Sequence, residues 1–371
     1  MKFAFCLYKY FPFGGLQRDF LRIAKACLHR GHTVDVFTMH WEGEQIPGIP
    51  VTIIPVKGWQ NHTRTRDFVE KLLPRLAPYD LVLGFNKMPG LDVYYAADTC
   101  YQAKAREKHG WLYRLTPRYQ HWLTYEKAVF ASIDTNILVI SKLQQAEFQR
   151  FYQTATERFH WLPPGIARDR IAPANAVDIR REVRLAFGLT ENDFLVLSVG
   201  SGFKTKGLDR VLQGLAALPD AVKQRTTLFV IGKDNPSRFQ RQAQKLGLSA
   251  QIHFLGGRED VPRFLLAADL LLHPAYNENT GTVILEAIAA GLPVLTTDVC
   301  GYASYVQEAN AGMVLSSPFQ QVAFNQALLS MLLSEQRSHW QQNAIQFAAQ
   351  ADIYSLPERA ATYLEIIARQ A

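Results

Sequence analysis

The residues best suited to chemistry follow an apolar run in the second half of the chain. Glu278 and Glu286 are eight residues apart, and Thr280-Gly281-Thr282 between them marks the start of a helix. Glu278 then lies in a loop, whereas Glu286 lies about one and a half turns into the helix and can still face a ligand. Carboxylates accept hydrogen bonds from neighbouring hydroxyl groups, so one glutamate can hold a sugar and the other a ribose. The bare spacing is common, but its place after an apolar strand makes it more specific.

A glycine-rich loop that opens another helix carries two positive charges. It runs from Ser198 to Gly207, follows an apolar run and includes Lys204 and Lys206. Ammonium groups and backbone N–H groups at a helix start suit a diphosphate, because both stabilise negative charge. A solvated basic loop explains the same pattern equally well. Arg170, which follows a Pro-Pro-Gly segment, is placed to reach the same ligand.

A second glycine turn, Phe13-Gly14-Gly15, lies near the start of the chain. It separates an apolar run from an amphipathic stretch, so its backbone N–H groups can approach a phosphate. It departs from the dinucleotide fingerprint G-x-G-x-x-G, and the chain has no G-K-[ST] of a P-loop. Taken alone, two such glycines more often mark just a tight strand-to-helix connection. Asp19, one turn into the helix, either interacts with the helix dipole or accepts a hydrogen bond from a sugar hydroxyl.

The hydrophobic pattern predicts the elements that position these loops. Short apolar runs alternate with amphipathic stretches, which is typical of strand–helix units and parallel sheets covered on both faces. Strands are predicted near 3–7, 33–37, 51–55, 81–84, 93–96 and 136–140, and again near 194–200, 227–231, 251–255, 270–273 and 293–296. After Thr296 the pattern is mostly helical, at 318–333, 335–349 and 355–369.

The segment Leu162-Pro163-Pro164-Gly165 interrupts this alternation and predicts a domain boundary. We therefore predict an α/β protein with two Rossmann-like, doubly wound domains that face each other across a cleft. The first domain spans residues 1–165, with residues 352–371 returning to it, and the second spans residues 166–351. Ligands in open α/β folds bind at the carboxyl ends of strands, so the chemistry is expected in the cleft.

The composition is that of a globular protein with excess positive charge. The 371 residues are 48% hydrophobic and 20% charged, with a net charge of +7, which excludes a disordered, collagenous or disulfide-scaffold chain. The chain lacks a signal peptide and any run of roughly 18 apolar residues, so we expect it in the cytoplasm with at most peripheral membrane contact. The cysteines and histidines lack metal-site spacing, and we expect no metal and no cofactor.

The excess charge lies in the first half, where residues 1–165 hold 21 Lys or Arg against 14 Asp or Glu. The segment Tyr101–Lys127 alone carries a net +4 and interleaves basic with aromatic residues. Such a segment suits the interface of an anionic bilayer. A solvated basic face with partly buried aromatic residues is the alternative. The predicted membrane contacts are Lys104, Arg106, Lys108, Trp111, Arg114, Arg118 and Trp122.

Together with the loops above, three longer segments carry a family resemblance: Phe5–Asp19, Gly84–Tyr94 and Cys300–Ala303. The chain resembles the retaining, nucleotide-sugar-dependent glycosyltransferases of the GT-B fold, and among these the lipopolysaccharide core glucosyltransferases, over essentially its whole length. The resemblance implies a hexosyltransferase that moves glucose from UDP-glucose to heptose II of the inner core in α1,3 linkage, with retention and without a metal.

The resemblance also implies roles for single residues at the donor. Arg170 and Lys206 would neutralise the pyrophosphate, Glu278 would bind the sugar and Glu286 the ribose. Gly15 and Gly281 would lie against the donor. Relatives often have Arg immediately before the phosphate-binding lysine, where this chain has Thr205, so Lys204 could supply that charge instead.

Three carboxylates are candidates for catalysis. Glu278 and Asp19 would lie near the reacting sugar, and Asp98 lies where such folds place a residue close to the anomeric carbon. Asp98 could equally be a helix cap.

The implied partners are a UDP-sugar, the lipid-A-anchored inner-core oligosaccharide and the inner face of the bacterial inner membrane. The protein itself is expected to be a monomer. Another donor sugar or acceptor, or a UDP-sugar epimerase, remains an alternative. The missing dinucleotide fingerprint argues against an NAD-dependent oxidoreductase. A basic nucleic-acid-binding protein is the non-enzyme alternative, but no nucleic-acid-binding module is recognisable.

Overall fold

The computed structural model describes residues 1–12, 14–108 and 110–370, which form two compact units. Unit 1 comprises residues 1–165 with 355–371, and unit 2 comprises residues 166–354. The chain therefore leaves unit 1 directly after Pro163-Pro164-Gly165. The returning segment begins at Ser355, not at Asp352, because Ile353 is buried in the core of unit 2 and its carbonyl accepts a hydrogen bond from Ile166 N–H (3.0 Å).

Unit 1 is built on a seven-stranded sheet in the order β3-β2-β1-β4-β5-β6-β7, with all strands parallel. The order reverses between β1 and β4, because the chain first builds outward to β3 and then returns to the other edge of β1. The strands are β1 (Lys2–Cys6), β2 (Thr33–Thr38), β3 (Val51–Ile53), β4 (Leu81–Gly84), β5 (Val93–Ala96), β6 (Asn136–Val139) and β7 (Phe159–Trp161).

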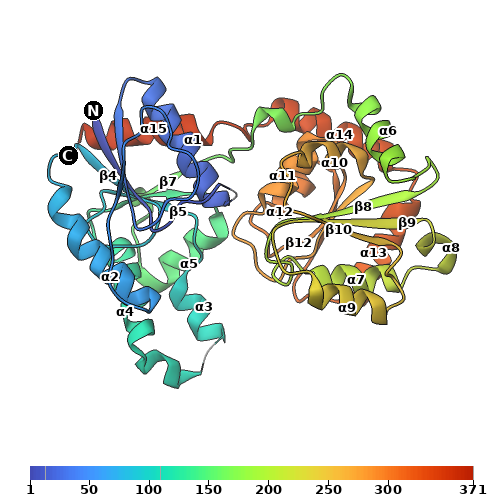
Figure 1. Cartoon of the computed structure of the whole chain (residues 1–371), viewed down its shortest axis with the longest axis horizontal. Coiled ribbons are helices and arrows are strands. Elements are labelled where there is room, and N and C mark those ends of the chain that lie inside the picture. Colours follow the sequence, from blue (N-terminus) through green and yellow to red (C-terminus); the bar gives the residue numbers. More distant parts are fainter. Residues whose placement is uncertain (13, 109, 371) are drawn as a thin grey trace. The chain divides into compact units, whose positions relative to one another are not determined.

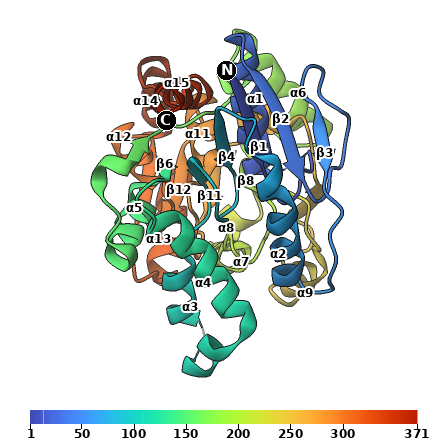
Figure 2. The ribbon, with the colours of Figure 1, turned by 90° about the vertical axis from the view of Figure 1, so that its left-hand side faces the viewer.

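Helices connect these strands and cover both faces of the sheet. They are α1 (Gly15–His29), α2 (Asn61–Leu72), η1 (Leu73–Arg75), α3 (Tyr101–Lys108), η2 (Trp111–Leu115), α4 (Pro117–Phe130), α5 (Lys142–Tyr152), η3 (Thr156–Arg158) and α15 (Leu356–Ala368). Figures 1 and 2 show that α3, η2 and the start of α4 project beyond the sheet of unit 1.

The C-terminal helix α15 lies beside α1 in both views (Figures 1 and 2). Phe20, Ile23 and Cys27 recur on one face of α1 at the spacing of an amphipathic helix, and all three are buried. Leu356 and Leu364 of α15 are buried in the same core cluster. The end of the chain is therefore an integral part of unit 1.

Unit 2 repeats the design with a six-stranded sheet in the order β10-β9-β8-β11-β12-β13, again parallel throughout. Along β8, Leu195 and Leu197 face one core cluster while Val196 faces the other, so the sheet is covered on both sides. The strands are β8 (Phe194–Val199), β9 (Thr226–Ile231), β10 (Ile252–Gly256), β11 (Leu270–His273), β12 (Val294–Thr297) and β13 (Gly312–Leu315).

The helices of unit 2 follow its strands in alternation until β13, after which two long helices precede the return to unit 1. They are η4 (Arg168–Arg170), α6 (Ala176–Ala186), α7 (Leu208–Ala216), α8 (Asp220–Lys223), α9 (Ser237–Lys245), α10 (Val261–Ala267), α11 (Thr282–Ala289), α12 (Ala303–Glu308), α13 (Gln321–Leu333) and α14 (Arg337–Gln350). Every helix in the described part of the chain is too short or too polar to cross a bilayer.

Two doubly wound parallel sheets confirm the predicted α/β fold class. The prediction missed β7 and β13, which are the last strands added to each sheet. Both are edge strands of three or four residues and are only partly buried, so neither shows the continuous apolar run of a central strand. The mostly helical chain expected after Thr296 is confirmed by α13, α14 and α15, and β13 is a strand that the prediction did not include.

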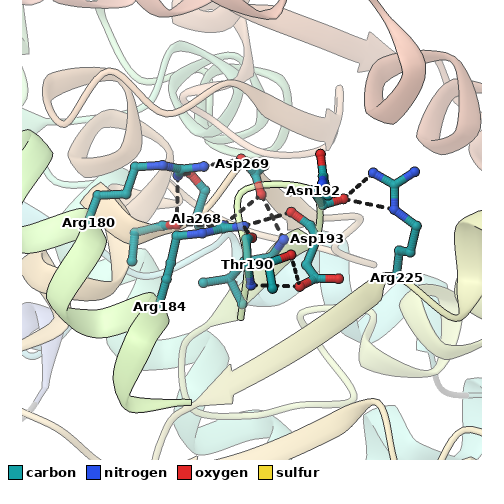
Figure 3. Close-up of polar contacts among 10 residues, drawn as sticks. Arg180, Arg184, Thr190, Asn192, Asp193, Arg225, Ala268 and Asp269 are labelled. Carbon is teal, nitrogen blue, oxygen red and sulfur yellow. Dashed lines mark hydrogen bonds and ion pairs between the residues drawn. The ribbon is translucent and has the colours of Figure 1, made fainter. Parts of the chain in front are cut away.

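A buried ion-pair network joins α6 to the turn before β11 (Figure 3). The side chain of Arg184 is 2% exposed, and its Nη1 atom donates to Asp269 Oδ2 (3.1 Å). The same carboxylate oxygen accepts the N–H of Leu195 (2.7 Å), and Oδ1 accepts from Arg180 Nη2 (2.6 Å). Asp269 therefore neutralises two cations and also fixes the backbone at the start of β8.

We predict that Asp269→Ala lowers the free energy of unfolding by about 3–5 kcal/mol, because it leaves two guanidinium groups without their carboxylate. Urea denaturation would measure this loss. Asp178→Ala is the matched control, since its ion pair with Arg181 (3.4 Å) is exposed and contributes less than about 1 kcal/mol. Equal, small losses in the two variants would show that the network does not stabilise unit 2.

Candidate functional site

The strand order of unit 2 reverses between β8 and β11, and the loops that leave the carboxyl ends of these strands lie side by side. The first loop covers residues 200–207 and leads into α7, and the second covers residues 274–281 and leads into α11. The N–H of Tyr276 donates to the Thr205 carbonyl (2.8 Å), which joins the two loops. Ligands of open parallel sheets bind at such a position. The topology thus unites the two segments that the sequence singled out.

Gly207 allows the two loops to approach each other. Its φ is +79°, and a Cβ atom at this position would lie 2.0 Å from the carbonyl oxygen of Pro274. Arg210 of α7 strengthens the junction, because its Nη1 donates to the carbonyls of Pro274 (3.0 Å) and Ala275 (2.9 Å). These contacts fix the two loops against each other at the strand ends.

Lys206 and Glu278, one from each loop, form an ion pair. Their side chains are only 21% and 15% exposed, so each charge depends on the other for compensation. Burial lowers the pKa of Lys206, and the nearby Cys300 thiol opposes this shift. An ammonium group beside a carboxylate can bind an anionic group and a hydroxyl group of one ligand. Two residues predicted to bind the donor are thus in contact.

His273, at the end of β11, lies next to this ion pair. The ring is buried, and its Nε2 atom is 3.7 Å from Glu278 Oε2. Burial and, secondarily, the charge of Lys206 lower the pKa of His273 to about 3, so the ring is neutral near pH 7. Neither ring nitrogen has a hydrogen-bond partner among the described residues. No spacing in the sequence predicts that His273, the last residue of an apolar strand, lies beside this ion pair.

A second cation–carboxylate pair joins η4 to α11. Arg170 Nε lies 3.6 Å from Glu286 Oε1 and 3.7 Å from Asp169 Oδ1. The side chain of Glu286 is 9% exposed. The resemblance grouped Arg170 with Lys206 on one pyrophosphate, whereas the structure pairs each of the two cations with its own glutamate.

Gly281 forms the turn into α11 with φ +83°, and a Cβ atom at this position would lie 3.3 Å from Glu278 Cγ. The backbone of this turn is fixed by a third loop, after β12. Gly301 N–H donates to the Glu278 carbonyl (3.2 Å), and Tyr302 N–H donates to the Thr280 carbonyl (2.8 Å). In the sequence this third loop was noted only as part of the family resemblance. Its hydrogen bonds to the turn span more than twenty residues, and no local pattern predicts contacts of that kind.

Lys204 has different partners from Lys206. Its Nζ atom donates to the Asp209 carboxylate (2.5 Å) and to the hydroxyl of Tyr276 (2.9 Å). Its side chain is 48% exposed. Within this loop, the residue that faces Glu278 is therefore Lys206.

A cavity of about 270 Å³ lies at the corresponding position of unit 1, where the strand order reverses between β1 and β4. Tyr8 follows β1 and Asn86 follows β4, and the N–H of Tyr8 donates to Asn86 Oδ1 (2.8 Å). Asp98, after β5, lines this cavity with Lys87 and Lys104. The surrounding protein raises the pKa of Asp98 by limiting hydration, and Lys87 opposes the shift. Asp98 nevertheless remains exposed to the cavity.

Glu126 of α4 is fully buried and organises the loop that contains Asp98. It accepts hydrogen bonds from Lys87 Nζ (2.5 Å) and from the N–H groups of Tyr101 (2.7 Å) and Gln102 (2.9 Å). Lys87 Nζ also donates to the Thr99 carbonyl (2.8 Å). The sequence missed Glu126 because its partner Lys87 lies 39 residues away.

Asp19 and Gly15 lie on α1 of unit 1. The hydroxyl of Tyr95 in β5 donates to Asp19 Oδ2 (2.7 Å), so this carboxylate is tied to the sheet. Gly15 is the first residue of α1, and a Cβ atom there would meet no described atom within 4 Å. Nothing nearby requires glycine at this position, and the space beside it is open. Phe13 of the predicted turn lies outside the described residues.

The predicted membrane contacts lie on α3, η2 and α4. Trp111, Leu112 and Leu115 of η2 are 69%, 62% and 69% exposed. The basic residues whose side chains are described are exposed around them: Lys104, Arg106, Arg114 and Arg118. The side chain of Lys108 lies outside what the structure describes. Trp122 is half-buried and lines the Asp98 cavity.

Two family models together match most of the chain. The model described as Glycosyl transferases group 1 matches residues 180–347, which lie in unit 2. The model described as Glycosyltransferase Family 4 matches residues 13–170.

Known proteins similar to this chain are also glycosyltransferases. The lipopolysaccharide glucosyltransferase WaaG of Escherichia coli (strain K12) is 49% identical over 362 residues, which is 96% of this chain and 97% of WaaG. The crystal structure of WaaG superposes with a TM-score of 0.92 at 48% identity, covering 98% of this chain and 99% of that one. The Anabaena protein HepE, solved with UDP and glucose, has a TM-score of 0.76 at 19% identity over 99% of this chain and 100% of its own, which shows a shared fold.

Proposed function

Because the chain belongs to the glycosyltransferase family of the lipopolysaccharide glucosyltransferases, we propose that it transfers glucose from UDP-glucose to heptose II of the inner core. The proposed product is an α1,3 linkage formed with retention of configuration. The observation that carries the proposal is the Lys206–Glu278 ion pair at the strand ends of unit 2. A nucleotide sugar presents phosphate and hydroxyl groups together, so a single ligand can engage both partners.

Donor binding, in this proposal, exchanges the partners of the ion pair. The diphosphate replaces Glu278 beside Lys206, and the hydroxyl groups of glucose donate to the carboxylate that Lys206 has released. The exchange leaves each buried charged group with a hydrogen-bonding partner, which reduces the penalty of separating a buried ion pair. Glu286, beside Arg170, is proposed to accept from the ribose hydroxyl groups in the same manner.

Cleavage of the anomeric bond leaves negative charge on the departing diphosphate. We propose that Lys206, Arg170 and the N–H groups that follow Gly281 stabilise this charge, and that these protein groups take the place of a metal. Groups already fixed at the position where charge develops lower the barrier to reaction. Retention follows if the acceptor hydroxyl attacks from the face that the diphosphate leaves.

The acceptor, in this proposal, binds unit 1. Asp98 lies exposed in the cavity at the ends of β1, β4 and β5, with Lys87 and Lys104 around it. A carboxylate there can accept the hydrogen bond of an acceptor hydroxyl and orient it. Asp19, which Tyr95 holds in place, is a second candidate for contact with the reacting sugars.

We further propose that unit 1 lies against the cytoplasmic face of the bacterial inner membrane, where a lipid-anchored acceptor is found. The support is the η2 segment, which exposes Trp111, Leu112 and Leu115 among basic residues. Amphipathic and basic segments of this kind bind anionic bilayers through apolar contact and charge. The proposed enzyme acts as a monomer.

We predict that Glu278→Ala lowers kcat/KM for glucose transfer by at least about 100-fold, because it removes a contact to the reacting sugar. The measurement is transfer from UDP-glucose to a deacylated core acceptor, with circular dichroism to show that the variant is folded. Glu278→Gln keeps the volume of the side chain and should fail in the same way. Glu335→Ala, at an exposed position between α13 and α14, is the control and should transfer normally. A folded Glu278→Ala enzyme with near-normal turnover would refute the site.

For the membrane contact, we predict that the double variant Trp111→Ser/Arg114→Gln binds anionic vesicles more weakly by at least about fivefold. The lost charge alone accounts for about 1 kcal/mol, and the lost indole adds to it. Vesicle co-sedimentation measures the binding, and turnover of a deacylated acceptor should not change. Arg150→Gln in α5, an exposed arginine outside this segment, is the matched control. Vesicle binding equal to that of the wild type would reject the contact.

A further inference from the structure

We propose that unit 1 carries an extended trough for a saccharide, which begins at the Asp98 cavity and continues to the N-terminal ends of α2 and α4. Its occupant is an anionic oligosaccharide, so that several consecutive sugar units of the acceptor are bound and not only the one that reacts. This inference rests on the proposed function and deepens it.

The trough consists of three cavities that share lining residues. The Asp98 cavity, of about 270 Å³, shares Tyr8, Asn86 and Trp122 with a second cavity of about 240 Å³. The second shares Asn61 with a third of about 500 Å³, which also has Trp59 in its lining. One concave path therefore leads from the strand ends to the helix ends, and it is longer than a single sugar requires.

The lining has the chemistry that sugars need. A pyranose ring presents C–H bonds on its faces and hydroxyl groups around its rim. Trp122, Tyr8 and Trp59 supply aromatic surfaces on which such faces pack. Asn86 and Asn61 supply amides, which both donate and accept hydrogen bonds. Because Asn86 Oδ1 already accepts from Tyr8, its NH₂ group is the donor that it can offer to a ligand.

The charge of the lining selects an anionic saccharide. Along the three cavities the basic lining residues are Lys9, Arg64, Lys104 and Arg118, together with Lys87, whose charge Glu126 already compensates. Asp98 is the acidic residue among the described lining residues. Acceptor sugars that carry phosphate or carboxylate groups would offset this excess of cations, and a neutral glycan would not.

The walls of the trough are held before any ligand binds. His121, beside Trp122, contacts Thr65 of α2 through its Nε2 atom (2.8 Å from Oγ1), which joins α4 to α2. Glu126, also on α4, is joined to Lys87 in the loop after β4 (2.5 Å). Because the binding surface is already ordered, less of the binding free energy is lost to ordering its side chains.

The test uses acceptor fragments of two lengths, each ending in the heptose that reacts: a disaccharide and a deacylated core oligosaccharide of at least four sugars. The variants are Trp122→Ala near the reacting end and Trp59→Ala and Asn61→Ala at the far end. Trp59 and Asn61 are exposed, so their replacement leaves the core intact. Trp111→Ala, a tryptophan of the same unit that does not line the trough, is the control.

We predict that Trp122→Ala raises the acceptor KM about 3- to 10-fold for both fragments. Trp59→Ala and Asn61→Ala should raise it for the longer fragment alone, and Trp111→Ala for neither. The KM for UDP-glucose should stay unchanged in every variant, which separates loss of acceptor contact from general damage. If Trp122→Ala fails to fold, Trp122→Leu and the two far-end variants carry the test.

Two outcomes would overturn the trough: a wild-type acceptor KM for the longer fragment in the far-end variants, or equal effects of those variants on both fragments. Failure of the proposed function is a different result, since the wild-type enzyme would then transfer glucose to neither fragment. In that case direct titration of the longer fragment by calorimetry, without donor, still tests the trough, because Trp122→Ala should weaken binding and Trp111→Ala should not.

Discussion

The ion pair between Lys206 and Glu278 is the interaction on which the proposed donor site depends. It forms because β8 and β11 are neighbours in the sheet, while the chain continues from β8 to β9 on one side and from β11 to β12 on the other. The loops that follow β8 and β11 therefore lie side by side at the strand ends. Gly207 permits the contact of those loops, and the loop after β12 fixes the backbone of Glu278. The same reversal of strand order in unit 1 creates the cavity that contains Asp98. Both sites thus follow from one topological constraint applied twice.

The charged side chains of the proposed donor site form ion pairs within the protein. Lys206 is paired with Glu278, Arg170 with Glu286 and Lys204 with Asp209. A ligand with a diphosphate and several hydroxyl groups can replace both members of such a pair, whereas a simple anion replaces only the carboxylate. This difference gives a physical reason for selecting a nucleotide sugar over a free phosphate, because only the former leaves no buried charge without a partner.

The sequence was sufficient for the features that depend on local pattern. Continuous apolar runs located the central strands, and the glycine-containing loops that follow two of them located the starts of α7 and α11. It was insufficient for β7 and β13, whose edge positions leave them short and partly exposed. The partners of Glu278 and Glu126 lie 72 and 39 residues away, and no local spacing encodes contacts of that kind. The trough of unit 1 was also beyond prediction, because α2, α4 and two strand ends contribute to it from distant parts of the chain.

We propose above that donor binding exchanges the partners of Lys206 and Glu278. Calorimetric titration of Glu278→Gln with UDP and with UDP-glucose tests it most directly, because the two ligands differ only in the sugar that Glu278 is proposed to hold. We predict that the variant binds UDP at least as tightly as the wild type does, since Lys206 has lost its competing carboxylate, and that it binds UDP-glucose no more tightly than UDP. An equal loss of affinity for both ligands, or a preserved preference for UDP-glucose, would contradict it.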